Sequence, residues 1–556
     1  MELSDWISEN FNKPLYDYHI TPAGLVPNGR AHLGHIAGPI LKADLINRSL
    51  KVLGHKSKMI SGTDPDELHV VIKALDQKKE PFSLVHNYYE EIFEDFNKLF
   101  IEFDTFINPR GNEWVEDYES LNTELIDDLI NKQKVIFKEE KLPVLKKIGA
   151  KYIESEYVPK LNDFLIGGWI SGDCPTCNSK LVGFFCESCG GHYNHEEVSN
   201  KKSVYFSAEL IEENCKSLFL KGEEETNKNV LAHLKKMNFP KYYLSIVEKY
   251  INRTKGEMRV SIPTNWGMQY KHKNLTGNHA IFTYSAVLYG CHILAGKQYQ
   301  KLTDTKQNAL DKKSNVINIL TFGIDNTIPF AFGVTALGFA NSHYKPIDYF
   351  YPNYFYNLEG KKFSTSRGHV IWGGDIASIE KINPDFIRGY LCNTAPQEKP
   401  GDFNLENFIN YYNSKVFNVK KLLKFIDRRE FTSDLSRSEL ENWINKFSNV
   451  YSLDNFNPRN SENFTDELLI DLLKKVESKQ LNLEFLLVAA ILLNPVMPSL
   501  SDWIWKNLGQ KGDITLNSIS SIVLSKHFSL KPKLEEITFY DLEPCLPKTL
   551  ISEVTP

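Results

Sequence analysis

The segment from residue 15 to residue 80 constrains the fold most strongly, because its pattern reads strand, turn, helix, strand, helix. Residues 18–21 predict a short buried strand, which Pro27-Asn28-Gly29 ends sharply. Apolar residues recur at helical spacing over residues 33–53, and residues 58–62 have the pattern of a second strand. A strand, a helix and a second strand in this order favour a parallel, doubly wound sheet. Ligands of such sheets lie at the carboxyl ends of the strands, beside helix N-termini.

Length and composition exclude several classes of protein. A chain of 556 residues predicts three or four domains, at about 100–200 residues each. With 42% hydrophobic and 24% charged residues, it is neither disordered, nor collagen-like, nor a disulfide scaffold. No stretch approaches the ~20 consecutive apolar residues of a membrane span, and the first residues lack a signal-peptide pattern, so we expect a cytoplasmic protein without a membrane partner. The net charge of −5 neither requires nor excludes nucleic acid.

The remainder of the chain changes character several times. Residues 106–205 are polar, rich in turns and carry cysteines, so they read as an insertion. Strand-like apolar segments resume at 280–288 and 316–322, which predicts a sheet split by that insertion. From residue 404 the pattern is helical; within this part, 431–463 predicts a loop or a loosely packed stretch. Residues 481–493 predict a core helix that stops at Asn494-Pro495.

The first chemistry-bearing segment, residues 27–35, is named here the histidine turn. It holds two histidines, His32 and His35, in a glycine-containing turn that enters a helix. Free N–H groups and the positive dipole end make a helix N-terminus favourable for phosphate. Two imidazoles there can hydrogen-bond an α-phosphate as it becomes five-coordinate, and one preorganised donor is worth roughly 10²–10³ in rate. Taken alone, the pattern favours capping or surface histidines, because short motifs recur by chance.

The second segment, residues 358–368, is named here the lysine loop. It combines glycine, lysines and hydroxyl side chains, which suit a phosphate cradle. A lysine such as Lys362 acts there as a point charge on a departing pyrophosphate. Without other information the segment reads as an ordinary basic loop.

Four of the eight cysteines form two Cys-x₂-Cys pairs within sixteen residues. Cys174, Cys177, Cys186 and Cys189 have the spacing of a tetrahedral four-thiolate zinc site. No ligand position is left open for a substrate, so the predicted Zn²⁺ is structural and holds the insertion together.

Together these segments resemble a known family. His32-Leu33-Gly34-His35 is similar to the HIGH signature of class I aminoacyl-tRNA synthetases, and Lys362-Phe363-Ser364-Thr365-Ser366 resembles their KMSKS loop. Within that class the methionyl-tRNA synthetases match most closely, in residues 61–64, the paired cysteines, residues 322–325 and residues 386–391. The resemblance runs in patches from about residue 18 to residue 425.

The resemblance implies an α/β fold: a split Rossmann-like parallel sheet with a zinc-bearing insertion and a C-terminal α-helical bundle. It also implies five units. These are 1–105, the first half of the nucleotide-binding domain; 106–205, the connective insertion with the zinc knuckle; 206–340, the second half; 341–403, the KMSKS-like loop and stem-contact region; and 404–556, the C-terminal helical domain.

Roles of individual residues also follow from the resemblance. It implies catalytic roles for His32, His35 and Lys362, and it assigns the substrate α-ammonium to Asp64. ATP, accompanied by Mg²⁺, is assigned to six positions: Asn28, Gly34, Gly323, Asp325, Ser364 and Ser366.

The chain departs from the family at the amino-acid pocket. The pocket positions carry Gly24, Val26, Tyr284 and Phe330, which change both its volume and its hydrogen bonding, so the amino acid stays open. Thr365 stands where a second lysine is usual. The positions of the anticodon-reading asparagine and arginine carry Leu422 and Ile426.

The resemblance therefore predicts an ATP-dependent ligase that forms an aminoacyl-adenylate from ATP and an amino acid. Two acceptors stay open: a tRNA, as the family implies, or a small-molecule amine, which the departures at the pocket and at Leu422 and Ile426 favour. A catalytically silent RNA-binding paralogue is disfavoured, because both signatures persist.

Overall fold

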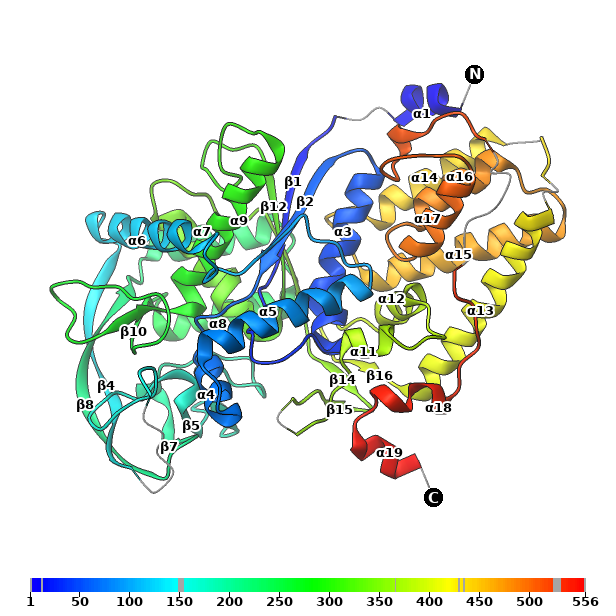
Figure 1. Cartoon of the computed structure of the whole chain (residues 1–556). Helices are drawn as coiled ribbons and strands as arrows, with labels where there is room; N and C mark the ends of the chain where they lie inside the picture. The colour runs from blue at the N-terminus through cyan, green and yellow to red at the C-terminus, as the bar shows by residue number, and fades with distance from the viewer. Residues whose placement is uncertain are drawn as a thin grey trace.

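A parallel sheet lies at the centre of the chain (Figure 1). The computed structural model describes residues 3–11, 14–148, 155–365, 367–428, 431–433, 436–523 and 532–554. Five strands pair in the order β13-β12-β1-β2-β3, all of them parallel. Their bounds are β1 Asp17–Pro22, β2 Lys56–Gly62, β3 Thr105–Ile107, β12 Ile317–Gly323 and β13 Tyr349–Asn353. The split parallel sheet that the sequence predicts is confirmed, because everything between β3 and β12 is inserted into it.

The helical run after the histidine turn covers one face of this sheet. It comprises α2 (Leu33–His35), a π-helical turn (Ile36–Ile40) and α3 (Leu41–Val52), so the helix predicted over 33–53 is confirmed. The interruption lies at Gly38 and Pro39, because proline has no N–H for the helical ladder and clashes with the preceding turn. Helix α9 (Leu288–Thr303) also packs on β1 and β2, on the other face (Figure 1).

The insertion is built on a long antiparallel ribbon. β4 (Val135–Ile148) pairs with β8 (Ala208–Leu220), and β9 (Met258–Arg259) adds to the same sheet. A small three-stranded sheet, β6-β5-β7, is interleaved with the cysteine pairs: β5 (Ile170–Asp173) precedes the first pair, β6 (Lys180–Val182) lies between the pairs, and β7 (Ser199–Ser203) follows the second. The β4–β8 pairing crosses the predicted boundary at residue 205, and the five domain boundaries stay a prediction.

One predicted strand segment is wrong. Residues 280–288 do not add a strand to the central sheet: β11 (His279–Ile281) pairs antiparallel with β10 (Ser261–Pro263), and a π-helical turn then leads into α9. Apart from the half-buried Tyr284, the segment is buried, and a buried run has no period that separates strand from helix.

Helices dominate from residue 405 onward, as predicted. The longer ones are α13 Leu405–Arg428, α14 Arg437–Val450, α15 Pro458–Glu477, α16 Leu483–Leu493 and α17 Pro498–Asn507, and the short helices α18 (Phe539–Leu542) and α19 (Lys548–Val554) follow. The predicted loop over 431–463 is wrong, because α14 and the start of α15 lie inside it. Helix α14 is amphipathic: Ser436 caps its first turn, and Leu440, Ile444 and Phe447 face the core. Its other face is polar, so the composition of the segment resembles that of a loop although the residues form a helix.

A buried ionic network joins the helical bundle to the sheet. Arg388, on α12 (Pro384–Asn393), donates to Asp44 Oδ2 on α3 at 2.6 Å and to the carbonyl oxygens of Pro495 and Val496 at 2.5 and 3.2 Å. Arg48 donates to the same carboxylate at 3.0 Å, and the side chains of Asp44 and Arg388 are both 0% exposed. Every polar atom named here has a partner, so the bundle is fixed to the base of α3.

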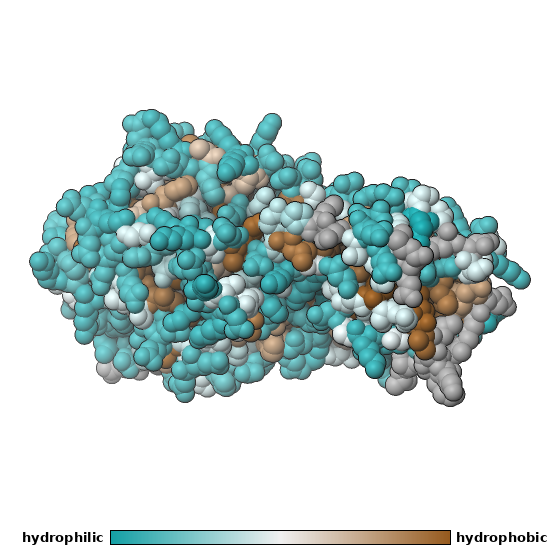
Figure 2. Space-filling model, turned by 90° about the horizontal axis from the view of Figure 1, so that it is seen from above, coloured by the Kyte–Doolittle hydropathy of each residue, from teal (hydrophilic) through white to brown (hydrophobic). Residues whose placement is uncertain are grey.

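The molecule is elongated, with the insertion at one end and the helical bundle at the other (Figure 1). Seen from above, the surface is mainly hydrophilic, and apolar residues lie in separate patches, several of them near the waist (Figure 2). Within the part of the chain that the structure describes, no helix is long and apolar enough to cross a membrane.

Candidate active site

The polar residues predicted for the site come together at the carboxyl edge of the sheet. β1 leads to Gly24 and the histidine turn, β2 leads to Asp64, and β12 leads to Gly323 and Asp325. The segments after β1 and β2 are joined directly, because the N–H of Asp64 donates to the carbonyl oxygen of Leu25 at 2.8 Å. The edge is therefore a shared surface of three strand ends, where parallel sheets bind ligands.

The two histidines stack on each other at the start of the helical run. The ring centroids of His32 and His35 lie 3.6 Å apart, and the rings are inclined by only 17°. His32 is also the N-cap of α2: its Nδ1 accepts from the N–H of His35 at 3.3 Å. Because Nδ1 accepts, the neutral His32 ring carries its proton on Nε2, which leaves that atom as a donor.

Both imidazoles are neutral at physiological pH. Burial lowers the pKa of His35 to about 4. Burial, followed by the neighbouring His35 and then Lys362, lowers the pKa of His32 well below its ordinary value. Nδ1 of His35 is buried without a protein partner. Two neutral rings offer N–H donors to a phosphate without changing charge during a reaction.

Gly34 permits the close approach of this pair. A Cβ at position 34 would lie 3.0 Å from two atoms of the His32 ring and 3.3 Å from Cδ2 of Phe363. Only a residue without a side chain lets the ring and the lysine loop pack against the histidine turn at this point.

The lysine loop packs directly on the histidine turn, although the two are far apart in the sequence. Phe363 stacks on His32 with ring centroids 4.9 Å apart and an angle of 11°. The following segment pairs with the turn through the backbone: Leu33 N–H donates to Ile371 O at 3.0 Å, and Gly373 N–H donates to Ala31 O at 2.8 Å. The structure therefore brings the two predicted phosphate-binding segments together.

Lys362 lies within the lysine loop, on a short strand. It ends β15 (Lys361–Lys362), which pairs with β14 (Tyr356–Leu358). Its ammonium lies 2.5 Å from Oε1 of Glu187 and 4.4 Å from the centroid of the Phe355 ring. Its charge lowers the pKa values of both His32 and Asp325, as expected for a cation between the two strand ends.

Four of the other predicted ATP positions lie at or just after the end of β12, in the lysine loop and in the histidine turn. Oδ1 of Asp325 lies 2.6 Å from the place that a Cβ at Gly323 would occupy, so any side chain at position 323 would displace the carboxylate. Burial raises the pKa of Asp325, and Lys362 opposes that rise. Ser364 pairs through its backbone with His369, both N–H···O distances being 3.0 Å, and half-buried Asn28 lies in the histidine turn. Ser366 lies outside the described residues.

A narrow pocket of about 40 Å³ lies between the strand ends and α9. Gly24, Asp64 and Phe330 line it, among mainly apolar neighbours. Oδ1 of Asp64 is buried without a protein partner. Burial raises the pKa of Asp64 well above its ordinary value of 3.8, and Glu67 and Asp66 raise it further. The carboxyl group is thus suited to ionise when a cation binds next to it.

Two predicted pocket residues lie outside this lining. Val26 and Tyr284 belong to a neighbouring apolar cluster. The hydroxyl of Tyr284 donates to Oε1 of Glu67 at 3.3 Å, which orients the ring beside the acidic residues that follow β2. Val26 and Tyr284 therefore lie beside the pocket and do not line it.

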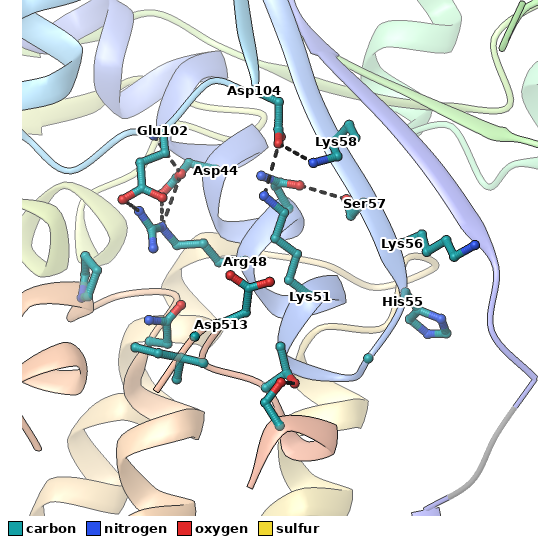
Figure 3. A pocket seen from close by; sticks show the side chains of 18 of the residues that line it. Asp44, Arg48, Lys51, His55, Lys56, Ser57, Lys58, Glu102, Asp104 and Asp513 are labelled. Carbon is teal, nitrogen blue, oxygen red and sulfur yellow. Dashed lines mark hydrogen bonds and ion pairs between the residues drawn. The ribbon is translucent and has the colours of Figure 1, made fainter. Parts of the chain in front are cut away.

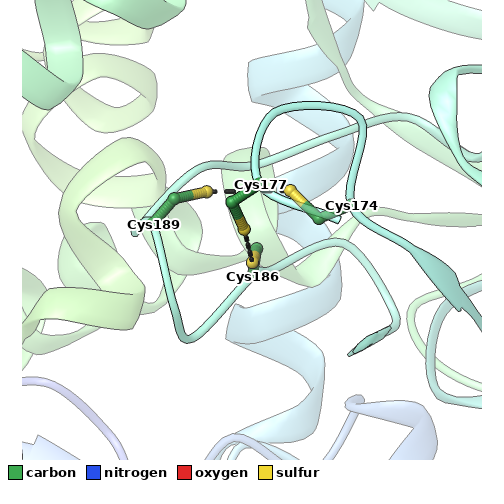
Figure 4. A group of neighbouring side chains, drawn as sticks. All are labelled: Cys174, Cys177, Cys186 and Cys189. Carbon is green, nitrogen blue, oxygen red and sulfur yellow. Dashed lines mark hydrogen bonds between the residues drawn. The ribbon is translucent and has the colours of Figure 1, made fainter. Parts of the chain in front are cut away.

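The four predicted metal ligands converge (Figure 4). Their sulfur atoms all lie within 4.8 Å of one another, with 3.7 Å between Cys174 and Cys189 and 3.5 Å between Cys177 and Cys186. A disulfide needs about 2.05 Å, whereas thiolates at ~2.3 Å from one zinc ion lie roughly 3.8 Å apart. The donor set fits a structural zinc ion, and among the described residues it is the only group of three or more close metal-ligating side chains.

Sequence reasoning missed the residues that hold the site together. Asp95, on α5 (Pro81–Lys98), accepts from Arg30 at 2.6 and 3.2 Å, from Ala31 N–H at 3.0 Å and from Gly374 N–H at 3.1 Å. One buried carboxylate therefore clamps the histidine turn to the segment after the lysine loop. A single aspartate on an amphipathic helix carries no local signal of this role.

A wide polar groove of about 1000 Å³ lies elsewhere, between the amino end of β2 and the helical bundle (Figure 3). Most of its charges neutralise one another: Lys51 and Lys58 both face Asp104, at 3.4 and 2.8 Å, and Arg48 faces Asp44. None of the predicted site residues lines it.

Comparisons with known proteins agree with this arrangement. A model of the family "tRNA synthetases class I (M)" matches residues 18–429. A methionine–tRNA ligase from Methanococcus aeolicus is 24% identical over 408 residues, which cover 72% of this chain and 57% of that protein. One from Thermoplasma volcanium is 25% identical over 558 residues, covering 91% of this chain and 94% of the other. The chain belongs to the class I tRNA synthetase family of the M type.

A solved structure shares the fold. The Mycobacterium tuberculosis methionyl-tRNA synthetase in complex with methionyl-adenylate superimposes with a TM-score of 0.62 at 15% identity, over 89% of this chain and 94% of the other. The α/β fold with its inserted cysteine cluster and helical C-terminal region is therefore that of the methionyl-tRNA synthetases. The chain spans only about 57% of the length of the first curated relatives that it matches.

Proposed function

We propose that the chain joins ATP and an amino acid into an aminoacyl-adenylate, releases pyrophosphate and passes the aminoacyl group to a tRNA. The observation that carries the proposal is the packing of the lysine loop on the histidine turn beside the Asp64 pocket. These segments lie at the edge of a parallel sheet where nucleotides bind, and they offer neutral donors, a cation and a carboxylate. The family match covers all of them.

The phosphate chemistry follows from the charges at this edge. An amino-acid carboxylate oxygen attacks the α-phosphorus, a P–O bond to that oxygen forms, and the P–O bond to pyrophosphate breaks with its electron pair leaving on pyrophosphate. Nε2–H of His32 and the ring of His35 donate to the α-phosphate oxygens, and Lys362 balances the charge on the leaving pyrophosphate. Asn28, Gly34, Gly323, Asp325, Ser364 and Ser366 are the residues proposed to hold ATP.

The amino-acid side is proposed to be the narrow pocket. Asp64 pairs with the α-ammonium, and Gly24 and Phe330, with Val26 and Tyr284 behind them, surround the side chain. The relatives are methionine–tRNA ligases, and one was solved with methionyl-adenylate, so methionine is the first amino acid to test.

The metals have different places in the proposal. Mg²⁺ accompanies ATP through the phosphate oxygens, as is usual for this ion. Zn²⁺, held by Cys174, Cys177, Cys186 and Cys189, supplies tetrahedral coordination that stabilises the insertion. We expect the proposed enzyme in the cytoplasm, where cysteines stay reduced and able to bind zinc.

Pyrophosphate exchange with a panel of amino acids tests the function. We expect amino-acid-dependent exchange of labelled pyrophosphate into ATP, and a rate about 10²-fold lower in Lys362→Ala. Lys506→Ala, a lysine in an exposed ion pair with Asp502, is the control and leaves the rate unchanged. If no amino acid of the panel supports exchange, or if Lys362→Ala exchanges at the unaltered rate, the proposal is contradicted.

A second acceptor has its own support. The two positions matched to anticodon reading, Leu422 and Ile426, are 1% and 2% exposed in the core of the bundle, where no base reaches them. This favours transfer to a small-molecule amine. Labelled amino acid that becomes acid-precipitable with total tRNA supports tRNA as acceptor; a soluble labelled amide formed with an amine panel, and no precipitable label, supports the second candidate.

A further inference from the structure

The loop that carries the cysteines touches the proposed nucleotide site at two points. This segment, residues 174–193, is called the cysteine knuckle. Nε2 of His192 lies 2.7 Å from the carbonyl oxygen of Asp325, and the ring of Phe185 packs edge-on against Phe355 with centroids 6.4 Å apart. A Cβ at Gly190 would meet Ile324 at 3.7 Å. The knuckle is therefore seated against the end of β12 and the hairpin that carries Lys362.

The contact between the knuckle and Lys362 is ionic. Glu187 lies between the third and fourth cysteines, and its Oε1 is 2.5 Å from Nζ of Lys362. The Phe355 ring lies on another side of the same ammonium, at 4.4 Å. The Glu187 and Lys362 side chains are 60% and 39% exposed, so water competes for both charges and the pair is exchangeable.

Lys362 cannot serve Glu187 and a pyrophosphate group equally well. One carboxylate carries a single negative charge, whereas the triphosphate of ATP carries several and offers more acceptor oxygens. A triphosphate on the histidine turn would therefore draw the ammonium away from the knuckle. The surroundings of Nζ fit this exchange, because Lys362 already affects the pKa values of His32 and Asp325 on the nucleotide side.

We propose that Glu187 is a positioning residue that holds Lys362 on the cysteine knuckle in the ATP-free enzyme and competes with the triphosphate for it. The proposal rests on the proposed ATP-dependent function. Its consequence is a retracted resting position of the lysine loop, to which Lys362 returns after pyrophosphate has left. The knuckle thus acts on the reaction through the loop, without contacting substrate.

The test compares ATP affinity in matched variants of the zinc-loaded full chain. We expect Glu187→Gln to tighten binding of a non-hydrolysable ATP analogue by about two- to fivefold in calorimetry, the scale of an exposed ion pair. KM for ATP falls by the same factor, with kcat changed less than twofold. Glu212→Gln, which breaks an exposed ion pair with Lys201 in the same insertion, is the control and leaves both values unchanged.

A double variant separates this role from a structural one. In a Lys362→Ala background the Glu187→Gln substitution has no further effect on analogue affinity, because the competing pair is already absent. Glu187→Asp, which keeps the charge, stays closer to wild type than Glu187→Gln. Unchanged or weaker affinity in Glu187→Gln at full zinc content, or an equal change without Lys362, overturns the inference. If no amino acid supports exchange, the proposed function fails, while analogue affinity still decides the role of Glu187.

Discussion

The buried junction between sheet and bundle and the edge that carries the site use the same kinds of groups in opposite ways. At the junction, the carboxylate of Asp44 receives two arginines, and Arg388 also donates to backbone carbonyls. At the edge, Oδ1 of Asp64 and Nδ1 of His35 are buried without protein partners. Their pKa values differ accordingly. Burial alone would raise that of Asp44, but Arg48 and Arg388 outweigh it and the pKa is lowered, whereas that of Asp64 is raised.

This difference teaches how to separate scaffold from site in the chain. A satisfied buried network stabilises one arrangement, and a buried polar atom without a partner destabilises the free protein until something binds. Substitutions at the junction should therefore change stability, and substitutions at the edge should change function.

The junction is the place for the largest loss of stability. Arg388→Ala leaves Asp44 as a buried charge with one arginine fewer, and we expect a loss of about 3–5 kcal/mol in the free energy of unfolding. Chemical denaturation followed by circular dichroism measures it. Lys506→Ala, in an exposed pair, should lower it by less than about 1 kcal/mol. Equal losses in the free energy of unfolding for Arg388→Ala and Lys506→Ala would contradict a special role of the buried junction in stability.

The histidine turn should show the reverse result. His35→Ala removes a proposed donor to the α-phosphate, so we expect pyrophosphate exchange to slow by roughly 10²–10³-fold. Its stability should change less than that of Arg388→Ala, because removal of an unpartnered buried nitrogen opposes the cost of the cavity that the stacked ring leaves. His343→Ala, at a side chain 67% exposed, is the control for the rate. A variant that loses stability while keeping its rate would reassign His35 to the scaffold.

Gly34 tests how closely the histidines must be placed. In Gly34→Ala the new methyl group meets the His32 ring at 3.0 Å, so the ring or the loop must shift. A shift of this kind should lower the exchange rate by roughly 10–10²-fold while the ATP analogue still binds. Gly360→Asn, at an open position whose left-handed backbone (φ +71°) asparagine tolerates better than most residues, is a control for the loop. An unaffected rate would show that the stacked geometry is not required.

The smallest effects are those of pH. Because the pKa of Asp64 is raised, its carboxyl group is protonated over part of the acid range, and an α-ammonium needs the ionised form. KM for the amino acid should therefore fall as pH rises through the raised pKa, and Asp64→Asn should remove that dependence. The neutral histidines should add no inflection near their ordinary value of 6.5, because the pKa of His35 is about 4.

The same group links pH to stability with a definite sign. The folded chain keeps the Asp64 proton where the unfolded chain has already released it, so this residue lowers stability progressively as pH rises above 3.8 towards its raised pKa. Asp64→Asn should then be more stable than wild type at neutral pH, measured by thermal unfolding. Greater stability of wild type at neutral pH would contradict the raised pKa.

Much of the sheet and the convergence of its two motifs could be predicted from the sequence. The buried strand at residues 18–21 ends at a clear turn signal, the helix after His32 has a clear period, and the paired cysteines have a spacing that few other structures produce. The predictions for residues 280–288 and 431–463 are wrong. The first segment is buried apart from Tyr284, and the polar face of α14 outweighs its apolar stripe in the composition. Local pattern cannot reveal Asp95 or Glu187, because their partners lie far away in the sequence.

The helical run from α2 to α3 carries Asp44 near its middle. Because Asp44 pairs with Arg388, the sheet and the bundle cannot be replaced independently by those of a homologue. If these parts came from a homologue without an arginine at the place of Arg388, the carboxylate of Asp44 would be buried without that partner. A chimera of this chain would need to take Asp44, Arg48 and Arg388 from the same parent protein.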